Sequence, residues 1–225
     1  MIEPLERALE AKFDALAQGL AEPGYAVMAN FFPTDLALTL AAETQARWQA
    51  GAFRAAGVGR GPGWVRRPDI RGDEVCWLED KAPSPALAQA LATLDGLKAH
   101  LNAVLFAGLE DFEVHLARYG RGAFYARHID QFEDTTRRAI SIVLYLNHQW
   151  RRQDGGALRL WTTPAPGREA PSGKTPYVEV LPEAGTLVAF RSADFWHEVR
   201  RARRPRLSLT GWFLRRAANP LEQLA

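Results

Sequence analysis

Short β-type segments fill the second half of the chain, and they limit its possible folds more than any other feature. From Phe112 onward, eight runs rich in β-branched and aromatic residues alternate with turn-forming residues. In order they are FEVHLARY, AFYARHI, AISIVLYL, ALRLW, YVEVL, GTLVAF, WHEVR and RLSLTGWFL. Eight short strands at this spacing predict a closed or double-sheet antiparallel architecture.

The first half is mainly helical in pattern. Apolar residues recur at helical spacing over 5–20, Pro33-Thr34-Asp35 opens a second helix that runs to about Ala50, and a third is expected over 85–105. Two strands, Tyr25 to Phe32 and EVCWLED, and a Gly-, Arg- and Pro-rich loop over 51–74 are also expected. The fold class is therefore mainly β with flanking helices (α+β).

Composition indicates a globular protein. Of the 225 residues, 47% are hydrophobic and 24% charged, which argues against disorder. No stretch of about 18 apolar residues occurs, so no membrane span is expected. The acidic N-terminal segment differs from a secretory signal. With Cys76 as the single cysteine, an intrachain disulfide and a cysteine metal cluster are excluded, and we expect a reducing, cytoplasmic setting.

Charge is unevenly distributed. The net charge is +2, but residues 121–216 contain 17 Lys and Arg against 9 Asp and Glu, which leaves the remainder with an excess of negative charge. This asymmetry predicts that the second half handles anions. Chance clustering on a mixed surface is the alternative.

The segment FYARHID contains a candidate metal site. His128 and Asp130 are two residues apart in a strand pattern, so their side chains are expected on one face. His197, in the later run WHEVR, can supply a second imidazole. Two histidines and one carboxylate on one face of an octahedral ion are typical of non-haem Fe(II) oxygenases. The His-x-Asp pattern alone is common and unspecific.

The other histidines are weaker candidates. His115 alternates within EVHLARY and is expected to have a core or surface role, and His100 and His148 are expected at the surface.

Arg206 strengthens the metal hypothesis. It follows His197 by nine residues, across an expected hairpin at RRARRP. Its strand alternates, so Arg206, Ser208, Thr210 and Trp212 are expected to share a face. An inward guanidinium is costly unless it meets an anion, and Arg binds carboxylates in a bidentate manner. The alternative is that Arg206 belongs to a basic turn that is exposed to solvent.

These motifs resemble the prolyl hydroxylase domain (prolyl 4-hydroxylase-like) group of the 2-oxoglutarate/Fe(II)-dependent oxygenase superfamily, in a bacterial-type form. The resemblance covers DIRGDEVCWLED, ARYGRGAFYARHID, SIVLYLN, DGGALRLW, EAGTLVAF, WHEV and RLSLTGWF, roughly residues 69–214. It implies a double-stranded β-helix, or jelly roll, braced by N-terminal helices. One domain over 1–225 is expected, with helical support and a substrate loop in 1–108 and the β core in 109–216.

The resemblance also assigns roles to residues. It implies Fe(II) at His128, Asp130 and His197, and 2-oxoglutarate and O₂ as cosubstrates, with ascorbate as a supporting reductant. The cosubstrate residues are expected to be Arg206, Tyr145, Tyr119 and Thr210, with Tyr125 and Trp212 near the site and no catalytic residue beyond the metal centre. For the aromatic residues, ordinary barrel packing is the alternative.

The implied reaction is hydroxylation of a prolyl residue in a protein, with a translation GTPase as the partner to test. The loop over 51–74, with Trp64, corresponds to a mobile loop that closes over substrate in relatives, or is a passive surface loop. Nucleic-acid oxidative demethylation with the same triad is a second hypothesis, favoured less because the basic turn is short. A non-catalytic cupin-like binding module is a third.

Overall fold

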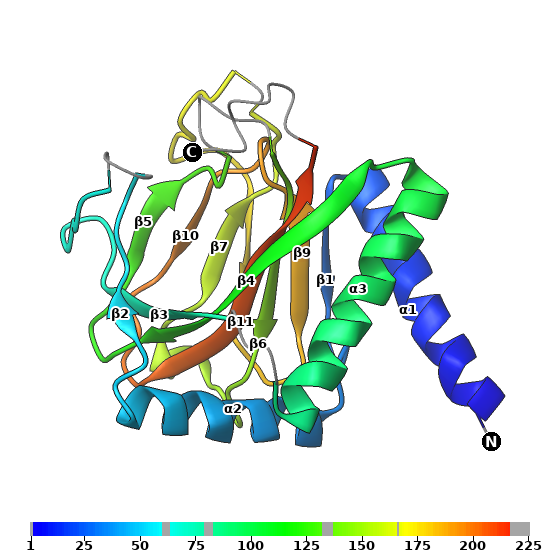
Figure 1. Cartoon of the computed structure of the whole chain (residues 1–225). Coiled ribbons are helices and arrows are strands. Elements are labelled where there is room, and N and C mark those ends of the chain that lie inside the picture. The colour runs from blue at the N-terminus through cyan, green and yellow to red at the C-terminus, as the bar shows by residue number, and fades with distance from the viewer. Residues whose placement is uncertain (1, 60–63, 79–82, 132–136, 166, 217–225) are drawn as a thin grey trace.

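The structure, a computed structural model, describes residues 2–59, 64–78, 83–131, 137–165 and 167–216 (Figure 1). Its three helices are α1 (Ile2–Ala21), α2 (Thr34–Gln49) and α3 (Pro85–Leu105). The bounds of α3 follow from its sequence: the Ser84 side chain accepts a hydrogen bond from the Leu87 N–H, and Pro85 occupies the first turn. Helix α3 ends at Leu105, and the next residue, Phe106, caps it in a left-handed conformation with φ 51°.

The strands form two antiparallel sheets. The larger sheet has the order β1 (Tyr25–Met28), β9 (Leu187–Arg191), β6 (Arg138–Tyr145), β11 (Arg206–Arg215), β4 (Leu109–Tyr119), β3 (Asp73–Trp77) and β2 (Arg54–Ala55). The smaller sheet has the order β5 (Tyr125–His128), β10 (His197–Val199), β7 (Leu158–Trp161) and β8 (Tyr177–Val180). The predicted double-sheet jelly roll is confirmed, and all eight strand segments of the second half form strands.

The strand expected over 25–32 is shorter than predicted. It ends at Met28, because Asn30 turns the chain with φ 54°. Phe31 and Phe32 then leave the sheet, and both are buried in the core.

The prediction of a hairpin at RRARRP is wrong. Strand β10 pairs with β5 and β7, whereas β11 pairs with β4 and β6. The turn at 200–205 therefore carries the chain from the smaller sheet to the larger one. It thereby places His197 and Arg206 in opposite layers.

Strand β11 shows how one sequence serves both faces of the larger sheet. Leu207, Leu209 and Phe213 belong to the core that the sheet forms with the helices. The alternating positions Arg206, Ser208, Thr210 and Trp212 instead line a pocket between the sheets, as predicted.

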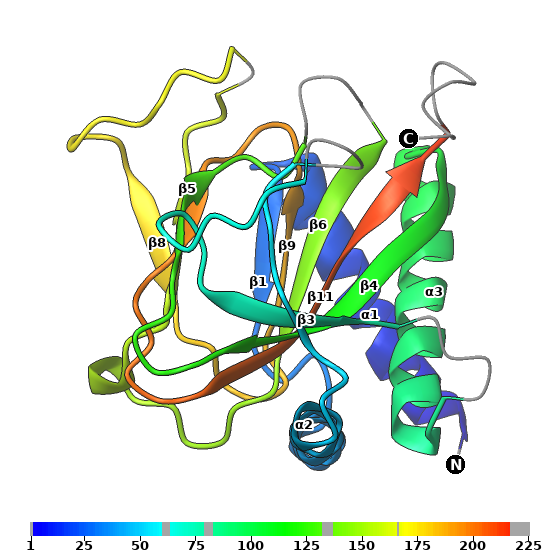
Figure 2. The same cartoon turned by 60° about the vertical axis from the view of Figure 1, so that its left-hand side comes forward.

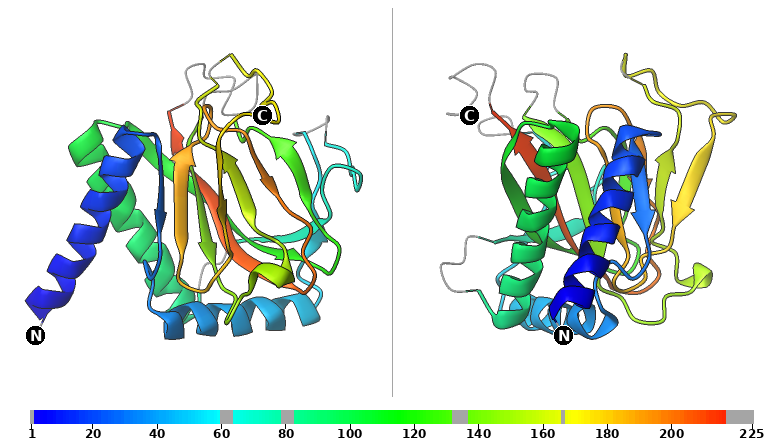
Figure 3. Two further views of the ribbon diagram at one scale, coloured as in Figure 1. Left: turned by 180° about the vertical axis from the view of Figure 1, so that it is seen from behind. Right: turned by 90° about the vertical axis from the view of Figure 1, so that its right-hand side faces the viewer.

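The helices cover the outer face of the larger sheet. Helices α1 and α3 lie side by side there, and α2 runs along one end of the two sheets (Figures 1 and 3). The smaller sheet lies on the side away from α1 and α3 (Figure 2). Among the described residues, no helix is long and apolar enough to cross a membrane.

Candidate active site

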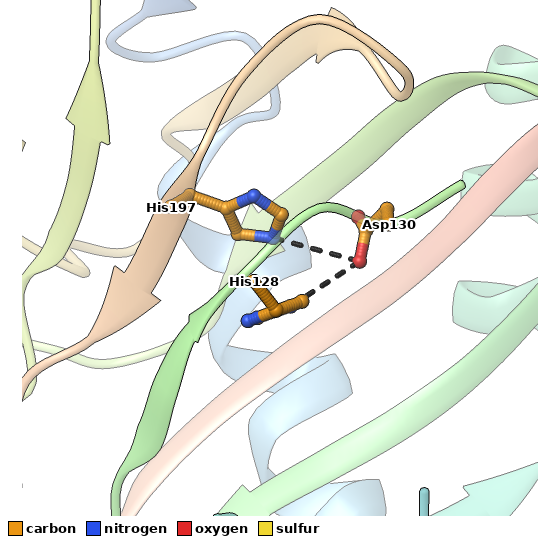
Figure 4. A group of neighbouring side chains, drawn as sticks. All are labelled: His128, Asp130 and His197. Atoms are coloured by element: carbon orange, nitrogen blue, oxygen red, sulfur yellow. Dashed lines mark ion pairs between the residues drawn. The ribbon is translucent and has the colours of Figure 1, made fainter. Parts of the chain in front are cut away.

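The three residues predicted to bind metal lie together between the sheets (Figure 4). His128 ends β5 and His197 begins β10, and the two residues are direct partners in the antiparallel register. One ligand atom from each of His128, Asp130 and His197 lies within 4.8 Å of the other two. No other group of three His, Cys, Asp or Glu side chains converges in this way in the described part of the chain.

Asp130 reaches this group by a different route from the one expected. Strand β5 ends at His128, so Asp130 lies in a bend beyond the strand. Its Oδ2 accepts a hydrogen bond of 2.6 Å from the Ser141 hydroxyl of β6. Its Oδ1 lies 3.3 Å from Nε2 of His128 and 3.5 Å from Nε2 of His197. Ser141 therefore fixes one carboxylate oxygen and leaves the other toward the imidazoles.

Backbone carbonyls orient both imidazoles. Nδ1 of His128 lies 2.7 Å from the Ala126 carbonyl oxygen, and Nδ1 of His197 lies 3.2 Å from that of Phe195. Because a carbonyl can only accept, each Nδ1 carries the proton and each Nε2 presents a lone pair to the centre of the group.

The electrostatics favour a cation at this position. Burial, followed by the neighbouring His197, lowers the pKa of His128 to about 4, so its imidazole is neutral near pH 7. Burial opposes the ionisation of Asp130, but His197 and His128 hold the pKa of its carboxyl well below the ordinary value. Two imidazoles and one carboxylate form the donor set that suits a divalent iron ion.

Arg206 is a buried cation that no described carboxylate neutralises. It is 1% exposed, and its Nε donates a hydrogen bond of 2.9 Å to the Gly156 carbonyl oxygen. No Asp or Glu side chain pairs with it among the described residues. Because an uncompensated buried charge is costly, this guanidinium suits the carboxylate of a ligand.

Two tyrosines surround Arg206. Its guanidinium carbon lies 4.8 Å from the ring centroid of Tyr119 and 5.0 Å from that of Tyr145. The Tyr145 hydroxyl is buried and has no hydrogen-bond partner of good geometry in the described part of the protein. Burial raises the pKa of Tyr145 to about 12, although Arg206 opposes the rise, so the hydroxyl remains a donor. The hydroxyl is thus an unpaired donor beside Arg206, although Tyr145 is fully buried and does not itself line the pocket that contains Arg206.

One pocket of about 530 Å³ joins the metal group to Arg206. Tyr119, Thr210 and Trp212 line it, as do residues 54–59 and Trp64 of the glycine-rich loop. Residues 60–63 of this loop lie outside the described residues. The volume is in the range of pockets that enclose a small ligand.

Tyr125 connects the metal group to an ion pair that sequence reasoning missed. Its ring stacks on His128 with centroids 3.6 Å apart, and the Arg71 guanidinium lies 4.1 Å from its centroid. Arg71 in turn pairs with the buried Asp73 at 2.6 Å. Arg71 and Asp73 are two residues apart beside a strand, and this spacing was the available signal.

His115 lies in the core, one of the two roles expected for it, and is not part of the metal group. It is buried, and its ring lies 4.7 Å from Trp77 and 5.5 Å from Trp212, centroid to centroid. It also lines the pocket. Burial lowers the pKa of His115 to about 3, which keeps its ring neutral.

The sequence and fold match known oxygenases. Residues 114–214 match the 2OG-Fe(II) oxygenase superfamily. A crystal structure of a Pseudomonas putida prolyl-4-hydroxylase has a TM-score of 0.79 and 43% identity, with coverage of 90% of this chain and 99% of that one. A Trichoplax adhaerens prolyl hydroxylase, in complex with a hypoxia inducible factor peptide fragment, shares the fold with a TM-score of 0.79 at 24% identity, covering 93% and 92%.

Human Egl nine homolog 1 is 29% identical over 155 residues, which are 64% of this chain and 33% of that protein. The matched part thus spans about a third of the length of that curated relative. The shared fold and the extended identity with the Pseudomonas enzyme show that the chain belongs to the prolyl hydroxylase group of the 2OG-Fe(II) oxygenase superfamily.

Proposed function

We propose that this protein is a 2-oxoglutarate- and Fe(II)-dependent dioxygenase that hydroxylates a prolyl residue of a protein. The observation that carries the proposal concerns Arg206. It is buried, has no Asp or Glu partner in the described part of the chain, and lines the same pocket as His128, Asp130 and His197. A metal site without Arg206 would serve many reactions, and Arg206 without the metal site would serve only binding.

The protein residues have separate tasks. When bound, Fe(II) and 2-oxoglutarate supply the oxidation: with O₂, a substrate C–H bond becomes C–OH, and 2-oxoglutarate becomes succinate and CO₂. His128, Asp130 and His197 bind the metal. Arg206 and the Tyr145 hydroxyl bind the carboxylate that 2-oxoglutarate directs away from the metal.

The remaining predicted residues shape the pocket. Tyr119 and Thr210 are expected to flank the cosubstrate, and Trp212 to close the wall of the pocket behind the cosubstrate. Tyr125 packs on His128. The loop that carries Trp64 covers the substrate and excludes water. Trp64 is 51% exposed, which suits a contact made only with substrate present.

Turnover of 2-oxoglutarate tests the oxygenase class. The protein is incubated with Fe(II), ascorbate and 2-oxoglutarate, with and without cell-extract protein, and succinate is measured. We expect succinate that disappears when a chelator is added and that is absent for His128→Ala. A wild-type protein that makes no succinate, even with extract present, would rule out the oxygenase and favour a binding module.

Mass spectrometry of the extract tests the substrate. We expect one or more proteins to gain an oxygen atom on a proline with the wild type and not with His128→Ala. A translation GTPase is the first partner to examine. Oxygen gain or methyl loss on nucleic acid in place of protein would support the demethylase alternative.

The setting of the activity is part of the proposal. We propose that the whole chain acts as one oxygenase domain in the cytoplasm. Ascorbate is expected to sustain turnover by keeping the iron ferrous.

A further inference from the structure

A second, larger groove lies on the outer face of the smaller sheet. Its volume is about 1770 Å³. Its floor is made by outward-facing side chains of β7, β8 and β10, among them Arg159, Tyr177 and Glu198. Figure 2 shows that this sheet is on the side of the molecule away from the covering helices, so none of the three helices covers the groove.

The groove concentrates positive charge. Eight arginines and two glutamates line it, an excess of six positive charges in a chain whose net charge is only +2. The arginines come from β5, β7 and three separate connections near residues 121, 151 and 200–203. Clustering of one sign in a concave surface raises the local concentration of anionic partners.

Some of these arginines are held in place by aromatic rings. The Arg201 guanidinium lies 4.2 Å from the Phe124 ring centroid and donates a hydrogen bond of 3.0 Å to the Gly122 carbonyl oxygen. The Arg159 guanidinium lies 4.2 Å from the Tyr177 ring centroid. Fixed guanidinium planes lose less conformational entropy when they bind a carboxylate.

Other arginines are free to bind a partner. Arg121 and Arg203 are exposed, and their side chains form no hydrogen bond or ion pair within the described residues. In contrast, Arg159 lies 2.7 Å from a carboxylate oxygen of Glu179 and 3.4 Å from one of Glu198. The positive charge that remains available is therefore at the rim, above a floor of mixed sign.

The groove adjoins the active-site pocket across the smaller sheet. Tyr125 and Val199 line both cavities. Tyr125 also stacks on the metal-site residue His128. The two cavities are therefore neighbours that share these two side chains, which places the groove close to the residue that a substrate would insert into the pocket.

We propose that this groove binds an acidic segment of the protein substrate, adjacent to the residue that enters the pocket. The proposal rests on the proposed function. The charge pattern favours a polypeptide over nucleic acid, because a continuous phosphate backbone would face the Glu179 and Glu198 carboxylates on the floor. A peptide supplies carboxylates for the rim arginines and backbone N–H groups for these glutamates.

Binding of a labelled peptide of ten glutamates, followed by fluorescence anisotropy, tests the groove. The test variant is Arg121→Glu with Arg203→Glu. The control is Arg215→Glu with Arg216→Glu, which changes the net charge equally at the far end of β11. We expect the test variant to bind at least about ten-fold more weakly than the wild type, and the control to stay within about two-fold. Equal weakening in both variants would mean a net-charge effect and overturn the proposal.

A labelled oligonucleotide of ten thymidines, measured alongside, identifies the class of partner. Tighter binding of this oligonucleotide than of the glutamate peptide, with the same dependence on Arg121 and Arg203, would assign the groove to nucleic acid and overturn the proposal.

Hydroxylation separates this proposal from the proposed function. Succinate formed without protein substrate should be equal in the wild type and the test variant, whereas proline oxygen gain in cell extract should fall at least about ten-fold in the test variant only. Unchanged proline hydroxylation would overturn the groove proposal and leave the oxygenase intact. No succinate from the wild type would instead remove the proposed function, while selective peptide binding would still establish an acidic-peptide site.

Discussion

Arg206 shows how a single residue links the fold to the chemistry. Its side chain is buried, and no Asp or Glu among the described residues pairs with it, so a ligand carboxylate can compensate its charge. Replacement by alanine removes a charge-assisted, bidentate contact, which is worth about 2–3 kcal/mol.

We therefore predict that Arg206→Ala weakens 2-oxoglutarate binding by about 30- to 160-fold and leaves iron affinity unchanged. Calorimetry of anaerobic 2-oxoglutarate binding and a metal titration measure the two effects. Arg54→Ala, which removes an exposed arginine from the same pocket, is the matched control and should bind 2-oxoglutarate normally. Loss of iron in Arg206→Ala would contradict the separation of roles.

His115 makes stability depend on pH. Its folded pKa of about 3 lies below the value of about 6.5 expected in an unfolded chain. Between these values the unfolded state binds the extra proton, so acid favours unfolding, and the stability present above pH 6.5 is lost as the pH falls. At pH 5 this residue alone destabilises the fold by about 2 kcal/mol relative to pH 8.

Between pH 8 and pH 5, we predict that the free energy of unfolding of His115→Leu falls by about 2 kcal/mol less than that of the wild type. Urea unfolding of the metal-free proteins at both pH values measures the difference. The comparison is made within each protein, so any change in packing between Trp77 and Trp212 cancels. Identical pH dependence in the two proteins would mean that His115 is protonated inside the fold.

Individual elements were predictable where local signals agreed with the tertiary structure. Helix α3 begins at Pro85 and ends at Leu105 as expected, because a serine cap, a proline and a periodic apolar stripe all indicate the same element. The alternation along β11 likewise predicted which residues line the pocket, since period-two patterning follows directly from strand geometry.

Other features depend on contacts that no local pattern encodes. The Ser141 hydrogen bond to Asp130 joins residues that lie eleven positions apart, on β6 and in the bend after β5. The turn at 200–205 resembles a hairpin locally, but the sheets that receive its two strands are determined by packing. The arginine groove was visible only as a regional excess of charge, because its residues come from several connections.

Gly211 is the point at which β11 depends on close backbone packing. A Cβ added there would clash with the Glu113 carbonyl oxygen and would lie 3.0 Å from Cα of Val114, both on β4. Strand β11 is central and paired on both sides, so it cannot move away.

We predict that Gly211→Ala destabilises the protein by about 1–3 kcal/mol or more. The control is Gly173→Ala, at an exposed glycine with nothing within 4 Å of the added Cβ, and it should be neutral. Denaturant unfolding measures both. Equal stability of the two variants would mean that β4 and β11 separate at little cost.

At the scale of the whole molecule, the smaller sheet serves two surfaces. Its inner face carries His128 and His197, and its outer face carries the arginine groove. The helices cover the opposite side of the larger sheet, so the smaller sheet stays open to a partner (Figure 2). The arginines of the groove therefore lie on this open side, where we propose that an acidic segment of the substrate binds.

Ligand binding should be measurable as stability of the whole fold. Ligands that bind only the folded state stabilise it, and 2-oxoglutarate at about one hundred times its Kd should contribute about 2.7 kcal/mol. For a chain of this size that corresponds to a rise in Tm of roughly 5–10 °C.

We predict one increase in Tm when Fe(II) is added and a further increase when 2-oxoglutarate is added, both measured without O₂. His128→Ala should lose the iron increment, whereas Arg206→Ala should keep it and lose the increment from 2-oxoglutarate. An undiminished rise from 2-oxoglutarate in metal-free protein would contradict a cosubstrate site shared between iron and Arg206, because the interactions with iron would then be missing without effect.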